Sequence, residues 1–314
     1  MARHLLKELV RVATTLLAVC FLINLLLNFM PGDPAAIVAG DTASPQQIEM
    51  VRKELRLDLG LAERYVAWLA DASRGNFGTS LANKPGAKVM DLIWERLPVT
   101  LQLTAFALVL SALVAVPAGI AAAVRRGSWV DQAVTGAGAL ALAVPGFVIG
   151  VLLVNFFAVQ LPIFPSGGFT RLSEGAGGWF MHLVLPALAL STISAAEIAR
   201  QTRAAMSDVL EESYIRTARS TGLPSWKVIL QHGGKAAAPP IVTVFGLQAA
   251  TLLGGVVVLE QVFVLPGLGS LAYDAVQIRD IPLIQGIVFV GAAIVLTINL
   301  VVDAALFYLV PKSR

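Results

Sequence analysis

Charged residues are scarce in this sequence, at 14% of 314 residues, whereas a soluble domain has about 25%. A chain with 57% hydrophobic residues and so little charge cannot cover a water-exposed surface, which excludes most soluble folds. Intrinsic disorder is excluded as well, because it requires few apolar residues and a high net charge, and here the net charge is only +3. Much of the chain must therefore lie in lipid.

Cysteine and histidine are also rare. The single cysteine, Cys20, excludes an intramolecular disulfide framework. The three histidines, His4, His182 and His232, are far apart in sequence and form no zinc-binding pattern. We therefore expect no metal-binding residues.

Motifs for nucleotide binding and hydrolysis are missing. The sequence holds neither the phosphate-binding pattern G-x-x-x-x-G-K-[ST] nor H-E-x-x-H. Gly78-Thr79-Ser80-Leu81-Ala82 is similar to a nucleophile elbow, but its last position is alanine and the loop around it has no histidine. The sequence thus predicts a chain with no catalytic and no cofactor-binding residue of its own.

What the sequence does contain is six long windows without charge. They lie between Arg11 and Asp33, between Arg96 and Arg125, from Asp131 through VPGFVIGVLLVNFFAV, between Glu174 and Glu197, between Lys235 and Glu260, and between Asp280 and Asp303. A membrane-spanning helix needs about 20 mostly apolar residues, and each window can supply them. The windows are solid apolar runs, unlike the short alternating strands of a membrane β-barrel. We expect an all-α polytopic membrane protein with six transmembrane helices, the first of them retained rather than cleaved as a signal.

Basic residues predict the orientation of these spans. With the N-terminus inside, the short cytoplasmic segments hold Arg3, Lys7, Arg11, Arg125, Arg126, Arg200, Arg203, Arg216, Arg219, Lys227, Lys235, Lys312 and Arg314. The two short outer loops hold only Arg171 and Arg279. Because short cytoplasmic loops carry the excess of lysine and arginine, both termini are expected to be cytoplasmic.

Small residues recur every four positions in three windows, each set on one helix face. The sets are Ser111, Ala115, Gly119 and Ala123; Ala133, Ala137 and Ala141; and Gly246, Ala250 and Gly254. Helices in lipid associate through close packing of small residues, so we expect helix packing at Ser111, Ala115, Gly119, Ala123, Gly246, Ala250 and Gly254. The alternative is that membrane helices are simply rich in alanine and glycine.

The spans hold essentially no ionisable residue. Glu197, Glu260 and Asp303 lie near span ends. Carriers driven by protons or sodium use carboxylates buried in the membrane, so their scarcity argues against an ion-coupled transporter. If the protein moves a solute, the energy is expected to come from another subunit.

The longest inner segment, residues 200–235, has a pattern of its own. No helix breaker interrupts Ser213 to Thr221, Gly222 stands where a left-handed C-cap belongs, and Ser225 is placed to N-cap a second short helix. The pattern predicts a helix, a glycine turn and a helix. It fits a solvated connector, a DNA-binding helix-turn-helix, or a docking helix for a cytosolic partner; tethering at both ends close to the bilayer disfavours DNA binding.

A series of motifs in a fixed order gives the sequence a family resemblance. The motifs are Pro31-Gly32-Asp33-Pro34, Leu57-Asp58-Leu59-Gly60-Leu61, Gly75-Asn76-Phe77-Gly78-Thr79-Ser80, Glu95-Arg96-Leu97-Pro98, Tyr214-Ile215-Arg216-Thr217-Ala218-Arg219 with Gly222, and Pro266-Gly267-Leu268-Gly269 with Arg279-Asp280. Over nearly the whole chain they resemble the permease subunits of bacterial ATP-binding-cassette (ABC) importers, in the dipeptide, oligopeptide and nickel branch. The general importer motif Glu-Ala-Ala is Arg216-Thr217-Ala218 here, a departure common in that branch.

The resemblance implies a type I ABC importer transmembrane fold, multi-pass in the bacterial inner membrane. The chain would form half of the translocation pathway for peptides or related small solutes, beside a second homologous permease in a heterodimer. Two cytosolic ABC ATPase subunits would hold ATP and magnesium, so no cofactor is expected on this chain. A substrate-binding protein would deliver the solute from outside.

The resemblance also assigns domains and residues. The domains would be 1–30 with the first span, an extracytoplasmic loop 31–97, and a five-span core 98–314 that contains the coupling segment 200–235. Residues 211–225 would dock the ATPase, through Glu211, Tyr214, Ile215, Thr217, Ala218, Arg219, Gly222 and Leu223. The binding protein would contact Trp68, Phe77, Pro266 and Gly267.

The alternative to an importer subunit is a secondary carrier or channel that works without ATP. Such a protein predicts carboxylates within the membrane and an internal repeat between the two halves. The sequence shows neither convincingly, so we favour the importer subunit.

Overall fold

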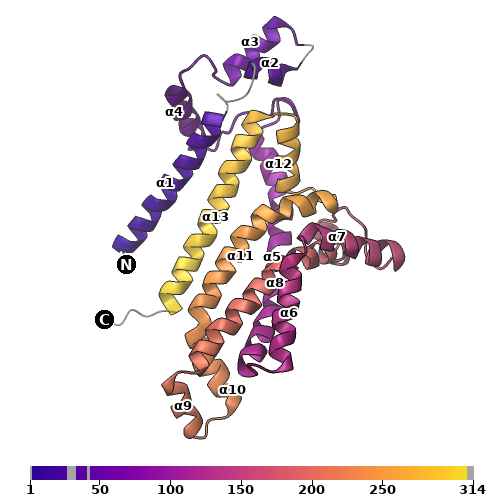
Figure 1. Ribbon diagram of the computed structural model, residues 1–314. Helices are drawn as coiled ribbons and strands as arrows, with labels where there is room; N and C mark the ends of the chain where they lie inside the picture. The colour runs from indigo at the N-terminus through magenta and orange to yellow at the C-terminus, as the bar shows by residue number, and fades with distance from the viewer. Residues whose placement is uncertain (1, 27–32, 41–42, 310–314) are drawn as a thin grey trace. The chain divides into compact units, whose positions relative to one another are not determined.

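The computed structural model describes residues 2–26, 33–40 and 43–309, and these are mainly helical (Figure 1). Within the described residues the only strand-like pairing is one bridge between Thr79 and Lys88. Pro31 and Gly32 of the opening motif, and the basic residues Lys312 and Arg314, lie outside the described residues. The all-helical prediction is confirmed.

The chain divides into two compact units. The first unit comprises Met1–Thr100 and Pro266–Thr297, and the second comprises Leu101–Leu265 and Ile298–Arg314. Two of the three boundaries fall inside long helices, α5 (Val89–Val124) and α13 (Ile281–Leu309), and the third falls in the loop between Leu265 and Pro266. The loop near Pro266 thus belongs with the N-terminal hundred residues.

Four helices in the described residues are long and apolar enough to cross a membrane: α5, α8 (Ala176–Leu210), the helical run Ser225–Val262, and α13. A fifth span results if the pair Trp129–Ala143 and Gly146–Gln160 is counted as one, although the two halves are bent by 93°. In α1 (Ala2–Leu26) the apolar stretch found among the described residues is only Ala13–Leu22. Six spans and the cytoplasmic termini stay predictions.

The third charge-free window is where the structure differs from a single helix. α6 (Trp129–Ala143) ends before Pro145, and α7 (Gly146–Val154) continues in a new direction into a π-helical turn, η2 (Asn155–Gln160). Val144 and Pro145 both have extended ψ angles, of 123° and 137°. Proline cannot donate a backbone hydrogen bond and disfavours helical geometry in the residue before it, so the helix breaks here.

The first unit is built from short capped helices around an aromatic core. It contains α2 (Pro34–Ala39), α3 (Pro45–Glu54), α4 (Leu61–Ala72) and α12 (Leu268–Gln277). Ser44 caps α3 in a full capping box, in which its Oγ accepts from Gln47 N at 3.3 Å and its own N donates to Gln47 Oε1 at 2.7 Å. Such a cap fixes the first turn of a short helix that buries none of its own residues.

The second unit is organised around α8. This helix packs against α6, α7 and α11 (Lys235–Val262), and fifteen of its residues are buried. The remaining elements are a short turn η3 (Leu172–Glu174), α9 (Ser213–Ser220), α10 (Ser225–Lys227) and the π-helical turn η4 (Val228–Gly234). Because η4 leads directly into α11, the chain stays helical from Ser225 onward, despite Pro239 and Pro240 inside α11.

Candidate functional site

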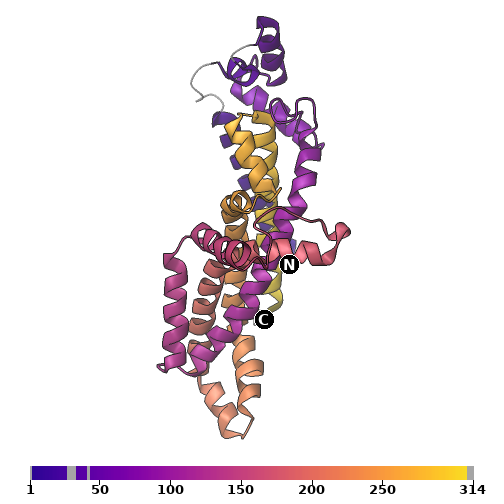
Figure 2. The same ribbon diagram turned by 90° about the vertical axis from the view of Figure 1, so that its right-hand side faces the viewer.

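The segment between α8 and α11 forms a helical hairpin in the second unit. Figures 1 and 2 both show α9 and α10 beyond the ends of α8 and α11, connected by short turns. Only Glu211 and Glu212 separate the end of α8 from the start of α9. The hairpin therefore extends the bundle and continues directly from its most buried helix.

Gly222 makes the turn of the hairpin. Its φ angle is +77°, and no atom lies within 4 Å of the position that a Cβ would occupy. The constraint is therefore conformational, since residues with a side chain rarely adopt this backbone geometry. The predicted left-handed glycine is confirmed, whereas the predicted cap is wrong: Pro224 occupies the N-cap position and Ser225 is the first helical residue. The second helix is also not a separate short one, because it continues into α11.

Most of the residues assigned to ATPase coupling are exposed. They are Glu211, Tyr214, Thr217, Arg219, Gly222 and Leu223. Tyr214 exposes 43% of its surface, whereas Ile215 exposes 0% and Ala218 is half-buried. α9 packs against η4, and a fully buried Ile215 can only anchor it there. The assignment of Ile215 to the contact surface is therefore corrected to an anchoring role.

Sequence reasoning missed an exposed aromatic residue in the same hairpin. Trp226, in α10, is exposed, and the Nζ atom of Lys227 lies 5.6 Å from its ring centroid. Exposed tryptophan is uncommon on a free surface and enriched at contact surfaces. The sequence could have indicated this exposure, because Trp226 stands two residues after Pro224 in a helix with too few apolar neighbours to bury it.

The small-residue set of α5 lies against α8. Ser111 donates through Oγ to the backbone oxygen of Ser191 at 3.2 Å, and Ala115 is buried beside Ile198 and Ala199. A Cβ on Gly119 would be 2.7 Å from both the backbone oxygen of Ala199 and Thr202 Cβ. Only glycine therefore fits at this level of the α5–α8 contact.

The last residue of the set continues the contact. Ala123 is buried with Ala205 and Met206 of α8 and with Ala237 of α11. At all four levels α5 thus approaches α8 through small side chains.

In the other two small-residue sets, some residues are buried and others are exposed. On α11, Gly246 is buried, and a Cβ built on it would lie 3.2 Å from Val302 Cβ of α13. Gly254 is exposed, with no atom within 4 Å of the position of its Cβ, and Ala250 is half-buried. On α6, Ala133 and Ala137 are exposed. Within the described chain, those exposed positions make no close helix contact.

The four residues assigned to binding-protein contact lie inside the first unit. The rings of Trp68, Phe77 and Phe289 form a cluster with centroids 5.1–6.1 Å apart. Phe77 is buried, Trp68 is partly buried against the same core, Gly267 is buried and Pro266 is half-buried. Trp68 and Phe77 thus belong to the packed core of the first unit, and the assignment of the four residues to binding-protein contact stays a prediction.

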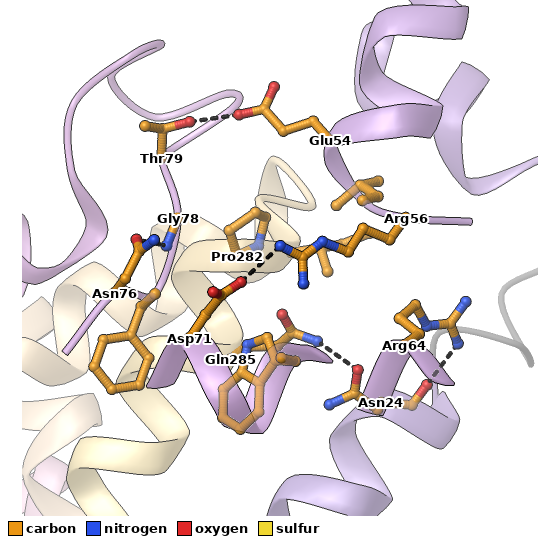
Figure 3. Close-up of a pocket in the computed structure, with 14 residues that line it drawn as sticks. Asn24, Glu54, Arg56, Arg64, Asp71, Asn76, Gly78, Thr79, Pro282 and Gln285 are labelled. Carbon is orange, nitrogen blue, oxygen red and sulfur yellow. Dashed lines mark hydrogen bonds and ion pairs between the residues drawn. The ribbon is translucent and has the colours of Figure 1, made fainter. Parts of the chain in front are cut away.

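A polar cavity of about 230 Å³ lies in the first unit (Figure 3). Its charged groups are largely paired: Arg56 Nη2 lies 2.7 Å from Asp71 Oδ2, and Glu54 Oε1 accepts from Thr79 Oγ1 at 2.5 Å. On its other side Gln285 Nε2 donates to Asn24 Oδ1 at 3.3 Å, and Arg64 Nη2 donates to the backbone oxygen of Asn24 at 3.3 Å. Burial lowers the pKa of the Arg64 guanidinium. These bonds join α1, α4, the loop after α3 and α13 within the unit.

A second cavity, of about 200 Å³, lies in the second unit where α7, α8 and α11 meet. Its wall includes Gly146 at the break between α6 and α7, and Gly255 on α11. No charged residue lines it, and its polar groups are Ser194, Gln248 and Thr251. Thr251 donates to the backbone oxygen of Leu247 at 2.8 Å, whereas Ser194 Oγ, on a residue only 1% exposed, has no hydrogen-bond partner among the described residues.

No group of three or more histidine, cysteine, aspartate or glutamate residues that could hold a metal ion is present in the described part of the chain. Neither cavity contains such a cluster. The functional candidates are therefore the hairpin surface and the uncharged cavity of the second unit.

Comparisons with known proteins cover the whole chain. Residues 115–314 match the family described as "Binding-protein-dependent transport system inner membrane component", and residues 1–104 match the N-terminal region of such membrane components. The "Probable peptide ABC transporter permease protein y4tP" of Sinorhizobium fredii is 40% identical over 314 residues, covering 100% of both chains. The "Glutathione transport system permease protein GsiC" of Escherichia coli is 38% identical over 100% of this chain and 99% of its own.

A solved structure shares the fold. It is an inward-facing conformation of the MetNI methionine ABC transporter, with a TM-score of 0.56 and 18% identity, over 70% of this chain and 97% of the matched chain. The expected type I importer fold is thereby confirmed.

Proposed function

The chain belongs to the family of binding-protein-dependent transport system inner membrane components, and from that premise we propose that it carries peptides, with its α9–α10 hairpin docked on an ATPase. As a family member it is a multi-pass inner-membrane permease subunit of an ABC importer, and ATP hydrolysis belongs to a separate chain. ATP and magnesium are then bound by that partner. The relatives named for peptide and glutathione transport support a peptide-like solute.

The observation that carries the docking proposal is the exposure of a helix that continues directly from α8. α9 buries Ile215 and leaves Tyr214, Thr217 and Arg219 exposed. A helix of eight residues does not persist in water on its own, so its anchored position serves to present the opposite face. A cleft in the ATPase is the proposed occupant of that face.

Co-purification tests the docking proposal. Tyr214→Ala should lower recovery of the cognate ATPase subunits with the full membrane complex, together with ATP hydrolysis. Tyr308→Ala is the matched control, because Tyr308 is an exposed tyrosine outside the hairpin, at the C-terminal end of α13. Equal recovery from both variants would contradict the proposal.

We propose that the uncharged cavity of the second unit contacts the solute in transit. Its apolar wall tolerates varied side chains, while the unpartnered Ser194 hydroxyl and the Gln248 amide can bond the main-chain amides that all peptides share. Gly255→Leu should fill the cavity and reduce uptake of labelled trialanine and glutathione into proteoliposomes. Gly254→Leu, one residue away and outside the cavity wall, should reduce it less; equal loss would refute this assignment.

The proposal includes two further partners, a second permease and a substrate-binding protein. A second homologous permease would complete the pathway in a heterodimer, and the exposed small residues Ala133 and Ala137 on α6 and Gly254 on α11 fit a neighbouring helix. The substrate-binding protein would contact the loop 31–97, where Met50 and Val66 are exposed, rather than the buried aromatic cluster.

A further inference from the structure

The turn between α5 and α6 is closed by a single carboxylate. Gly127 has a φ angle of +78°, and its N–H donates to Asp131 Oδ2 at 2.9 Å. Asp131 is the third residue of α6, a position from which a side chain reaches back over the helix start. The carboxylate therefore fixes the angle at which α6 leaves the turn.

The same carboxylate holds α8. Arg203 donates through Nε to Asp131 Oδ1 and through Nη2 to Asp131 Oδ2, the second at 2.8 Å. Asp131 is only 5% exposed. Two parallel bonds from one guanidinium restrict both the distance and the orientation of the two helices, unlike a single bond.

A second ion pair joins the same two segments. Arg126 Nη1 donates to Glu211 Oε1, and Glu211 follows the last residue of α8. The side chains of this pair are 62% and 70% exposed, so water and salt weaken it. Of the two links, the one at Asp131 must therefore hold the turn to α8.

α8 connects this junction to the hairpin. Its close contact with α5 at Gly119 and Thr202 lies beside Arg203, and α9 begins three residues after α8 ends. A displacement of α9 thus reaches α8 first. Whether it then moves the α5–α6 turn depends on how firmly α8 is fixed to that turn.

We propose that Asp131 and Arg203 are positioning residues for transport, whose ion pair makes the α5–α6 turn move together with the end of α8 next to α9. The pair acts as a rigid link that transmits hairpin motion into two further helices. The inference rests on the proposed function, in which the ATPase moves the hairpin. It adds a transmission path within this chain, between residues 72 positions apart.

Arg203→Lys and Asp131→Asn test the link in the complete transporter in proteoliposomes. Lysine keeps the charge but cannot form two parallel bonds, and asparagine keeps an acceptor for Gly127 but loses the charge. We expect solute transported per ATP hydrolysed to fall about tenfold, in the range of typical coupling between sites, while hydrolysis itself continues. Uptake of labelled trialanine and release of phosphate are measured together.

Arg200→Lys is the matched control. Arg200 lies on the same helix, and its partner is Glu197 of that helix, with Nη2 to Oε2 at 2.6 Å. This pair ties no two elements together, so its loss should leave the ratio of uptake to hydrolysis unchanged. A parallel fall of uptake and hydrolysis in the Arg203 variant would mean structural damage and would overturn the proposal, as would ratios equal to the control.

Covalent rescue distinguishes a rigid link from a switch that must open. In a Cys20→Ala background the sequence has no other cysteine, so Asp131→Cys with Arg203→Cys creates one reactive pair. A short bifunctional thiol reagent should restore the ratio lost in the double variant; further inhibition would show that the contact must break, and would overturn the link. If the unmodified chain failed to stimulate hydrolysis at all, the proposed function itself would fail.

Discussion

Replacement of Asp280 by alanine should open the loop that precedes α5 without unfolding the second unit. Asp280 is fully buried and accepts from Ser80 Oγ at 2.6 Å, from Ala82 N at 3.1 Å and from Asn83 N at 3.0 Å, all through Oδ2. These bonds join a loop near the start of the chain to a carboxylate 200 positions later, all within the first unit.

The size of the effect follows from those three donors. A hydrogen bond to a charged group contributes about 1.5–3 kcal/mol, and a buried donor left without a partner costs a similar amount. Ala82 and Asn83 are only half-buried, so their N–H groups can recover bonds to water. We therefore expect a loss of about 3 kcal/mol, which corresponds to an opening equilibrium about 150-fold more favourable.

Hydrogen–deuterium exchange of the purified protein in detergent measures this opening. The amides of Ala82 and Asn83 should exchange about 150-fold faster in Asp280→Ala, because exchange follows the population of the open loop. Asp274→Ala, on the exposed face of α12, should leave their exchange unchanged. Exchange rates in Asp280→Ala within threefold of the parent protein would refute the reasoning.

Three further predictions concern backbone space, backbone angle and protonation. Gly119→Ala places a Cβ against α8 and should lower the free energy of unfolding by about 1–3 kcal/mol, measured by thermal unfolding in detergent. Gly136→Ala, on an open face of α6, should not destabilise the protein, and equal unfolding midpoints of the two variants would contradict this. Gly222→Val and Gly86→Val each place a side chain at a positive φ angle, +77° and +84°, with a backbone strain of about 1–3 kcal/mol. Only Gly222→Val should uncouple ATP hydrolysis from uptake, and equal uptake by the two variants would refute the hairpin's role. Burial raises the pKa of the Tyr65 phenol, whose hydroxyl donates to a backbone oxygen of α1 at 2.7 Å. Its contribution to stability is then complete below a pH of about 10 and is lost as pH rises through the raised pKa, so Tyr65→Phe should remove that alkaline loss from pH-dependent unfolding curves; identical curves would contradict it.

The sequence predicted the structural features that depend only on residues close together in the chain. The helix that starts at Ser213 and the left-handed Gly222 both appear in the structure. The family also followed from sequence, because its motifs occur in order over the whole chain and the matched families cover the same residues. Each of these signals involves residues close together in the chain or a fixed motif order.

The rest depends on contacts that composition does not encode. Pro145 interrupts this apolar run, but a proline can either kink a helix or end it, so the sequence alone did not specify the 93° bend. Phe77 stands in a polar loop and looks available for docking, but it packs against Phe289, more than two hundred positions away. Asp131 and Arg203 likewise pair across the chain, and the count of basic residues placed Arg203 on the inner side without indicating a partner.

Site-specific photocrosslinking in intact membranes tests the docking of the hairpin most directly. A photoreactive phenylalanine analogue at Thr217, on the exposed face of α9, should yield a covalent adduct with the ATPase subunit. The same analogue at Tyr273, exposed on α12 in the first unit, should yield none. Absence of the adduct at Thr217, or equal adducts at both positions, would contradict the assignment of α9 as the ATPase-coupling helix.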